Sequence, residues 1–137
     1  MFSTPDLKDK YQKKVFQGFK SMKSFGSKDS FFGQIKTVTC HDDNSKVKEI
    51  LGTNGKGKVL VINSNLITHA AMIGDEIAQK AIDNEWNGIF VAGYVRDVEL
   101  LKQMDLGILA LGSTTTKTNK NNKGFLGEDV IFGGVIL

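Results

Sequence analysis

The sequence is poor in cysteine and has no long hydrophobic run, and both shortages restrict what the protein can be. Cys40 is the only cysteine among 137 residues, which excludes an internal disulfide and a zinc cluster built from cysteines. No apolar stretch is long enough to cross a membrane as a helix, and the start lacks the basic, apolar and cleavage-site regions of a secretory signal. We therefore expect a cytoplasmic protein that does not enter the membrane.

Excess charge is also small, with a formal net charge of +3 at pH 7. An imbalance of this size does not by itself indicate a nucleic-acid-binding protein. A length of 137 residues, with 40% hydrophobic and 24% charged residues, is ordinary for one globular domain with a real core. The composition thus predicts a single domain over residues 1–137.

Charge is distributed unevenly only near the N-terminus. Seven lysines stand there against one acid, Asp9: Lys8, Lys10, Lys13, Lys14, Lys20, Lys23 and Lys28. Phe16, Phe19 and Phe25 are interleaved with them, and basic side chains with stacking aromatics can bind single-stranded RNA. The alternative is an N-terminal helix and loop in which Val15 and the phenylalanines pack while the lysines are solvated. We favour the second interpretation, so direct nucleic-acid binding is not expected.

Apolar periodicity predicts the strands. Residues 33–40 alternate between apolar and polar side chains, which indicates a half-buried strand. Short continuous apolar runs have the length of buried parallel strands: 59–62, 89–92 and 107–111. Gly93 and Gly112 are expected to end the last two of these strands. A final strand is expected over 130–137, interrupted by Gly133-Gly134.

Between these strands the apolar spacing is helical. It predicts helices over 75–85 and 98–104, and a short helix carrying Val47, Ile50 and Leu51 that begins near Asp43, Asn44 or Ser45. Residues 63–72 are expected to be a connection, and residues 113–123 a polar loop that contributes nothing to the core. Strands joined by helices in this order form right-handed parallel βαβ units, flanked by further strands. The predicted fold is a mixed, layered α/β structure.

Two local patterns resemble ligand sites only loosely. Residues 52–57 contain three glycines, but Lys56-Gly57-Lys58 opens a strand, whereas a phosphate-binding Walker loop opens a helix. His41 is followed by Asp42 and Asp43, yet consecutive residues do not generally converge on one metal ion. We interpret both patterns as turns.

One arginine, Arg96, stands among seventeen lysines. It follows a predicted strand and precedes Asp97, and ligands of open α/β sheets bind beyond the carboxyl ends of strands. The chain uses lysine for every other positive charge, so arginine at this one position suggests a site that needs bidentate binding of a carboxylate or phosphate. The alternative is structural, with Arg96 and Asp97 tying down a loop or capping a helix.

Several motifs occur in the order found in one known family. They are residues 32–38, 54–61, 74–75, 84–88, 93–97, 106–108 and 132–135. With these motifs the chain resembles the family of the regulator of ribonuclease E activity A, which also contains the 4-hydroxy-4-methyl-2-oxoglutarate aldolases. The resemblance covers nearly the whole chain from about residue 6 onward.

The resemblance implies a swivelling β/β/α-type fold and a homotrimer with sites near the subunit interfaces. It also implies a divalent-metal aldolase that cleaves 4-hydroxy-4-methyl-2-oxoglutarate, or 4-carboxy-4-hydroxy-2-oxoadipate, and decarboxylates oxaloacetate, releasing pyruvate each time. Transferred residue by residue, the substrate is bound by Gly74, Asp75, Glu76, Ile77 and Arg96. Asp97 holds the metal.

The chemistry of these residues suits the implied reaction. Cleavage beside a 2-keto acid leaves a pyruvate enolate, which fixed positive charge from a metal and the Arg96 guanidinium would stabilise. Backbone N–H groups at the helix start after Gly74 are expected to be unpaired and suited to a carboxylate. A site with Asp97 and no histidine suits magnesium or manganese rather than zinc. Asp75 is expected to orient a metal-bound water as acid or base.

Two departures from the family pattern stand beside these matches. Ala92 occupies a position where many aldolase-type members have an acid, and the family usually continues past the Phe-Gly-Gly-Val motif into an acidic segment where this chain ends at Leu137. The competing hypothesis is a regulator that binds and inhibits ribonuclease E without catalysis. The presence of Asp97 favours retained chemistry.

Overall fold

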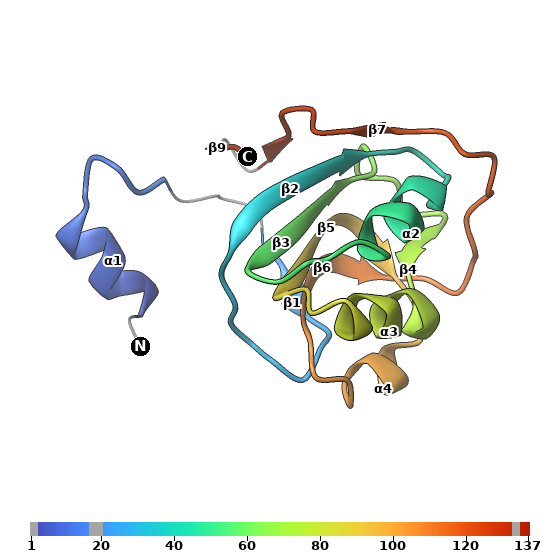
Figure 1. Ribbon diagram of the computed structural model, residues 1–137, viewed down its shortest axis with the longest axis horizontal. Helices are drawn as coiled ribbons and strands as arrows, with labels where there is room; N and C mark the ends of the chain where they lie inside the picture. Colours follow the sequence, from blue (N-terminus) through green and yellow to red (C-terminus); the bar gives the residue numbers. More distant parts are fainter. Residues whose placement is uncertain (1–2, 17–20, 133–134) are drawn as a thin grey trace.

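A seven-stranded sheet in the order β1-β6-β5-β3-β2-β7 forms the centre of the computed structural model (Figure 1), which describes residues 3–16, 21–132 and 135–137. Four central strands run parallel: β2 (Gln34–Thr39), β3 (Lys58–Asn63), β5 (Gly88–Val95) and β6 (Gly107–Ser113). β1 (Lys23–Ser24) pairs antiparallel with β6, and β7 (Phe125–Leu126) pairs antiparallel with β2. A short strand, β4 (Ala71–Ile73), pairs in parallel with the end of β5.

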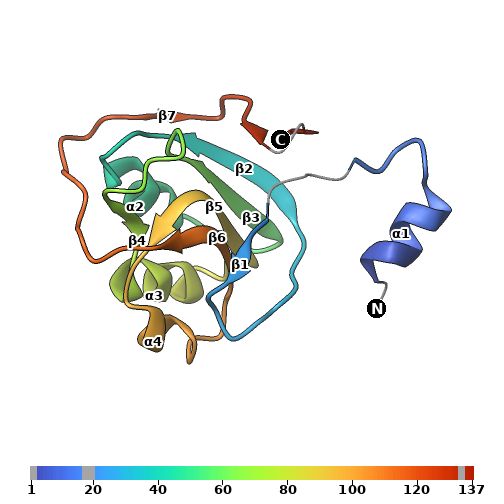
Figure 2. The same ribbon diagram turned by 180° about the vertical axis from the view of Figure 1, so that it is seen from behind.

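The helices of the sheet connections lie on one face. α2 (Ser45–Leu51), α3 (Asp75–Asp83) and α4 (Val98–Leu101) join strands that follow one another in both chain and sheet order. Right-handed crossovers in one direction across a sheet put every helix on the same side, as Figures 1 and 2 show. Leu60, Ile62 and Ile89 are fully buried beneath them. The α/β class with parallel βαβ units and flanking strands is therefore confirmed.

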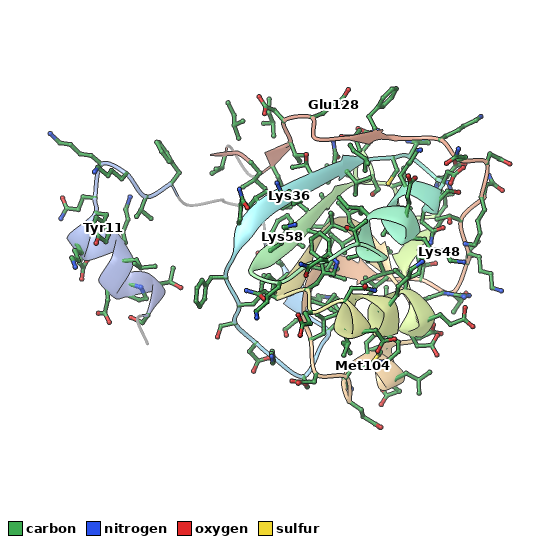
Figure 3. All side chains as sticks on the ribbon, viewed as in Figure 1. Tyr11, Lys36, Lys48, Lys58, Met104 and Glu128 are labelled. Atoms are coloured by element: carbon green, nitrogen blue, oxygen red, sulfur yellow. The ribbon has the colours of Figure 1, made fainter. Side chains whose placement is uncertain are left out.

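The C-terminal residues cross to the opposite face of the sheet. Phe132 meets Phe90 edge to face with ring centroids 5.0 Å apart, and Phe90 alternates with side chains that face the helices. The Thr37 hydroxyl donates a 2.6 Å hydrogen bond to the carbonyl of Glu128, which Figure 3 labels at the edge of the molecule. The expected single strand over 130–137 is instead a hairpin of β8 (Ile131–Phe132) and β9 (Val135–Ile136).

The N-terminal segment projects from the body of the protein in both ribbon views. α1 (Thr4–Lys10) begins after Ser3, whose hydroxyl accepts from the Asp6 N–H, and it contains no buried residue. Phe16 is 77% exposed, so the expectation of packed phenylalanines is wrong there and right for Phe25, which is 8% exposed. Phe19 lies outside the described residues.

Two glycines expected to end strands lie inside them. β5 continues through Gly93 to Val95, and β6 continues through Gly112 to Ser113. A Cβ at Gly93 would lie 2.2 Å from the Ser64 Oγ, so glycine serves close packing here rather than chain reversal. The connection expected at 63–72 also runs into β4, a three-residue strand too short to show periodicity.

The observed helices end only slightly earlier than predicted. α3 ends at Asp83, two residues early, and Glu85 adopts a left-handed φ of 65° in the turn that follows. α4 is a single turn that stops at Leu101. Within the described part of the chain, no helix is long and apolar enough to cross a membrane.

Candidate functional site

The pairing of β4 with β5 brings together the two ends of the segment 74–97. β4 ends at Ile73, directly before Gly74, and the Arg96 N–H donates a 3.0 Å hydrogen bond to the Ile73 carbonyl. The start of α3 and the Arg96-Asp97 pair therefore lie side by side at the carboxyl edge of the sheet. This is the edge at which open α/β sheets bind ligands.

Asp97 bridges these two segments. Its carboxylate Oδ2 accepts a 3.0 Å hydrogen bond from the Asp75 N–H, and its backbone adopts a left-handed conformation with φ 57° and ψ 41° that aims the side chain at α3. Aspartate tolerates this conformation better than most residues. Asp97 precedes α4 but makes no side-chain cap bond to it; instead its negative charge lies at the positive end of α3.

The environment of Asp97 keeps its carboxyl group ionised. The hydrogen bond from the Asp75 N–H lowers the pKa of Asp97, and the Asp75 side chain and the positive charges of Arg96 and Lys117 act in the same direction. Burial opposes this effect without reversing it. Asp97 is therefore a permanent anion at neutral pH, with 29% of its side chain exposed to solvent.

Glycine at position 74 permits this arrangement. A Cβ at Gly74 would lie 2.5 Å from the Asp97 Oδ2 and 3.2 Å from both the Cγ and the Nε of Arg96. Any larger residue would displace at least one of the two functional side chains. Gly74 is therefore part of the site because it has no side chain to occupy the space taken by Arg96 and Asp97.

Arg96 keeps its hydrogen-bonding capacity free. Its Nε lies 3.8 Å from the Asp97 Oδ2, which is an ion-pair distance but too long for a hydrogen bond. The guanidinium donates no hydrogen bond to any of the described residues. Its side chain is 30% exposed, so the planar fork of donors is open to a ligand.

The expectation of unpaired amides at the start of α3 needs one correction. The Asp75 N–H is occupied by Asp97, so it is not open to a substrate carboxylate. Within the described ranges, no acceptor faces the N–H of Glu76 or Ile77. These two groups remain suited to an anion at the positive end of the helix.

A pocket with a volume of about 120 Å³ opens beside these groups. One wall is formed by residues 74–77, Lys80 and Arg96. The opposite wall is formed by Asn44, by Lys48 of α2, and by Lys117, Thr118 and Lys120 of the loop that follows β6. Asp97 lines a neighbouring hollow of about 300 Å³ together with Ser113, Thr114 and Thr115, and Arg96 borders both spaces.

The loop after β6 lies outside the core, as predicted, but it also lines the pocket, which was not predicted. We call residues 114–123 the strap, because they run along the outside of α2 between β6 and β7 (Figure 1). The strap is joined to β4 by a 2.9 Å hydrogen bond from the Ala71 N–H to the Thr116 carbonyl. Lys117, Thr118 and Lys120 were missed as site residues. The signal available was their position after a strand at the same sheet edge as Arg96.

Asp43 fastens the strap to the turn before α2. Asp43 is 2% exposed, and its carboxylate accepts hydrogen bonds from the backbone N–H groups of Ser45, Asn121 and Lys123. Burial alone would raise the pKa of Asp43, but these hydrogen bonds outweigh it and hold the pKa below the ordinary value. Asp43 is thus a structural anion that joins the turn before α2 to the strap.

Replacing Asp43 with alanine should destabilise the protein by about 2–4 kcal/mol, because three backbone donors lose a charged acceptor. Urea unfolding measures this loss. Asp42→Ala is the matched control, since the Asp42 side chain accepts only a 3.4 Å exposed bond from Asn119, and it should cost about 0.5 kcal/mol or less. The Asp43 contribution is present above its ordinary pKa of 3.8 and is lost as the pH falls through the lower folded-state pKa. Equal stability of the two variants would contradict this role.

The donor set at Asp97 fits a hard divalent cation. No group of three or more histidine, cysteine or acidic residues able to hold a metal occurs in the part of the chain that the structure describes. The protein would then supply Asp97, with Asp75 adjacent, and leave other positions to water or substrate. Magnesium and manganese accept such oxygen-rich, partly hydrated sites, whereas structural zinc does not.

The comparisons with known proteins agree on the fold and differ in the names they carry. A family model described as RraA-like (Aldolase/RraA) matches residues 4–137. A Vibrio cholerae protein with the provisional name 4-hydroxy-4-methyl-2-oxoglutarate aldolase is 47% identical over 121 residues, which cover 88% of this chain and 75% of that protein.

Two solved structures superimpose closely. One is the RNA-processing inhibitor RraA from Thermus thermophilus, with a TM-score of 0.95 and 32% identity over 100% of this chain and 83% of that one. The other, from Geobacillus kaustophilus, is described as an S-adenosylmethionine:2-dimethylmenaquinone methyltransferase and has a TM-score of 0.96 and 32% identity over 98% of this chain and 84% of that one. The layered fold expected from the resemblance is confirmed, and the chemistry has to be argued from the site.

Proposed function

This chain belongs to the RraA-like family, and we propose that it is a divalent-metal-dependent lyase that releases pyruvate from 2-keto acids. The substrates would be 4-hydroxy-4-methyl-2-oxoglutarate or 4-carboxy-4-hydroxy-2-oxoadipate, with oxaloacetate decarboxylation as a second activity. The observation that carries the proposal is the position of Arg96, whose guanidinium makes no hydrogen bond with the described residues, between the open amides of α3 in one pocket and the ionised Asp97 carboxylate in the neighbouring hollow. Aldolase names among the relatives support the same class of reaction.

The 2-keto acid end of the substrate would lie between Arg96 and the start of α3. The Arg96 fork and the N–H groups of Glu76 and Ile77 offer donors to a carboxylate and a keto oxygen. The hydrogen bond from the Asp75 N–H to the Asp97 carboxylate holds the start of α3 in place. Binding at this point would fix the bond to be broken next to preorganised positive charge.

Cleavage breaks the bond between C3 and C4 of the substrate. In the two aldol substrates a base takes the proton of the C4 hydroxyl, the electron pair of the C3–C4 bond moves toward the keto group, and a carbonyl compound leaves. In oxaloacetate the electron pair moves in the same way and CO₂ leaves. In each case the pyruvate enolate must be stabilised until C3 takes a proton. The Arg96 guanidinium supplies fixed positive charge for the enolate oxygen. We assign the proton transfer to Asp75, a residue that lines the pocket together with Arg96.

Asp97 would hold a magnesium or manganese ion. The bound ion would supply further positive charge toward the keto oxygen. The lowered pKa of Asp97 supports this role, because a ligand carboxylate has to be ionised. The homotrimer, the cytoplasmic location and the choice between the two metals stay predictions.

A second candidate is a protein regulator of ribonuclease E. It is supported by the name of the Thermus relative and by exposed apolar side chains on the C-terminal strands, where Ile131 is 74% and Ile136 is 68% exposed. Such side chains suit contact with another protein. The two functions are compatible, because these residues lie outside the pocket.

Removing the metal should abolish activity. With magnesium or manganese, the protein should release pyruvate from oxaloacetate above the rate of metal alone, as followed by lactate dehydrogenase and NADH oxidation. EDTA should reduce this rate to background, and excess metal should restore it. Heat-denatured protein with metal controls for spontaneous decarboxylation. A rate unchanged by EDTA would contradict the proposal, and an inactive protein that inhibits ribonuclease E would support the second candidate instead.

A further inference from the structure

The N-terminal tract, which we define as residues 8–16, carries as much net charge as the whole protein. It contains one acid, Asp9, and four lysines: Lys8, Lys10, Lys13 and Lys14. Its net charge of +3 equals that of the complete chain, so the remaining residues are neutral overall. All four lysines are exposed, and none forms an ion pair with a described residue. The excess positive charge of the protein is therefore concentrated in one short segment that faces solvent.

Two exposed aromatic rings accompany this charge. Tyr11 is 41% exposed and Phe16 is 77% exposed. The Lys10 ammonium lies 5.2 Å from the centroid of the Tyr11 ring, which is a cation–π distance. The interpretation of this region as a solvated helix and loop required its aromatic side chains to pack, and in this tract they do not. The structure thus removes the reason for preferring that interpretation to nucleic-acid binding.

Local hydrogen bonds join the rings and the lysines into one unit. The backbone N–H groups of Lys14 and Val15 donate to the Tyr11 carbonyl at 2.7 and 3.1 Å. The Lys8 ammonium donates a 3.0 Å hydrogen bond to the Val15 carbonyl. These bonds turn the chain back onto α1, so Phe16 begins next to the helix that carries the first two lysines. The charge and the rings are therefore held close together by the tract itself.

The tract lies away from the proposed lyase site. It projects from the body of the protein, and Figure 3 labels Tyr11 on this projecting segment. The half-buried residue of α1, Leu7, lines a hollow of about 630 Å³ together with Phe32 and Trp86 of the body. None of the residues that line the pocket beside Arg96 belongs to the tract. A ligand on the tract would leave the lyase site open.

We propose that the N-terminal tract binds single-stranded nucleic acid, with Lys10, Lys13 and Lys14 on the phosphates and Tyr11 and Phe16 stacked on bases. Cations that follow the backbone and rings that stack on bases are the two contacts such strands offer to a protein. Both contacts are independent of base sequence, so the expected binding has little sequence preference. The inference does not depend on the proposed lyase function.

The rings decide between this ligand and other polyanions. An acidic protein surface would pair with the lysines and make no use of two stacking rings. Duplex bases are already stacked on one another, so a duplex offers the tract its phosphates alone. Binding to an anionic membrane requires a helix with an apolar face, and the large apolar side chain of α1 is Leu7 alone. A single strand is the ligand that uses both kinds of side chain.

The test measures fluorescence anisotropy of a labelled oligouridine, about 12 nucleotides long, titrated with the full-length protein. We expect a Kd of roughly 1–100 µM at about 50 mM NaCl. Raising NaCl to about 200 mM should weaken binding about twentyfold, because three phosphate contacts release counterions. Oligodeoxythymidine of the same length is measured in parallel, and the tighter of the two identifies the class of strand. A Kd above about 1 mM for both strands at low salt would overturn the proposal.

Variants separate stacking from charge. Tyr11→Ala/Phe16→Ala should weaken binding about tenfold or more and leave the salt dependence unchanged, because it removes stacking alone. Lys13→Gln/Lys14→Gln should weaken binding at low salt and reduce the effect of the same salt increase to about threefold, because one phosphate contact remains. α1 contains no buried residue and these four side chains are exposed, so neither variant should unfold the protein.

Lys56→Gln/Lys123→Gln is the matched control, since both lysines are exposed and lie outside the tract. It removes the same charge and should change the Kd by less than about twofold. A control variant that loses as much affinity as the tract variants, or a ring variant that binds like the wild type, would overturn the proposal. So would a duplex of the same length that binds as tightly as the single strand. Displacement of the strand by polyglutamate, or by vesicles of phosphatidylserine, with equal strength in the wild type and the ring variant would assign the tract to an acidic protein or to a membrane instead.

Discussion

Replacing Arg96 with lysine should lower kcat/KM for pyruvate release from oxaloacetate by about a hundredfold. Lysine keeps the charge but loses the planar fork, so it cannot pair with a carboxylate and an enolate oxygen in fixed geometry. The Arg96 guanidinium makes no hydrogen bond with the described residues, so the native function of its donors has to be sought in a ligand. The loss should fall on kcat as well as on KM, because the enolate exists only after the bond is broken.

The control for this variant is the stability of the fold. Because the Arg96 side chain is 30% exposed and its guanidinium forms no closer contact with a charged group of the described residues than a 3.8 Å ion pair, the free energy of unfolding of Arg96→Lys should lie within about 0.5 kcal/mol of the wild-type value. Steady-state kinetics and urea unfolding are measured on the same preparation. Unchanged kinetics would exclude Arg96 as a substrate ligand, and a large loss of stability would assign it the structural role instead.

Replacing Asp97 with alanine should abolish metal-dependent activity, a loss of about a thousandfold or more. The reason is the loss of the ionised Asp97 carboxylate, to which we assign the metal. The same change removes the acceptor of the Asp75 N–H, so it should also cost about 1–2 kcal/mol of stability. Loss of activity in this variant alone would therefore not separate the two roles.

Asp97→Asn makes that separation. Its side-chain oxygen can still accept the 3.0 Å hydrogen bond from Asp75, and asparagine tolerates the left-handed backbone at this position. This variant should keep most of the stability and lose the negative charge that a divalent cation requires. Activity is measured against magnesium concentration, and unfolding is followed in urea. An asparagine variant that keeps wild-type activity and metal response would remove Asp97 from the metal site.

The orientation of the helix amides shows how the two roles of Asp97 depend on each other. The Asp97 carboxylate, which would hold the metal, also accepts the hydrogen bond from the first N–H of α3. The N–H groups of Glu76 and Ile77 are then left for the substrate. Gly74 makes the approach possible, since a Cβ there would lie 2.5 Å from the Asp97 Oδ2. Metal, helix start and substrate would therefore share one small group of residues.

The sequence alone determined the parts of the fold that repeat locally. Helical spacing from Ile77 to Ile82 and the apolar runs of β3, β5 and β6 arise from burial on one or both faces, and burial leaves a periodic trace in the chain. The sequence also showed that the one arginine, Arg96, follows a predicted strand and precedes Asp97. The carboxyl ends of parallel strands share one edge, so the site could be assigned to that edge before its geometry was known.

Only the tertiary structure decided which polar groups meet. The Asp75 N–H and the Asp97 carboxylate are 22 residues apart, and Asn44 and Lys120 are 76 residues apart. Hydrogen bonds between distant loops follow no periodicity, because they depend on how β4 and the strap lie against the turn before α2. For this reason a polar loop that was predicted only to lie outside the core also forms the second wall of the pocket, with Asp43 and Asn44 as its buried supports.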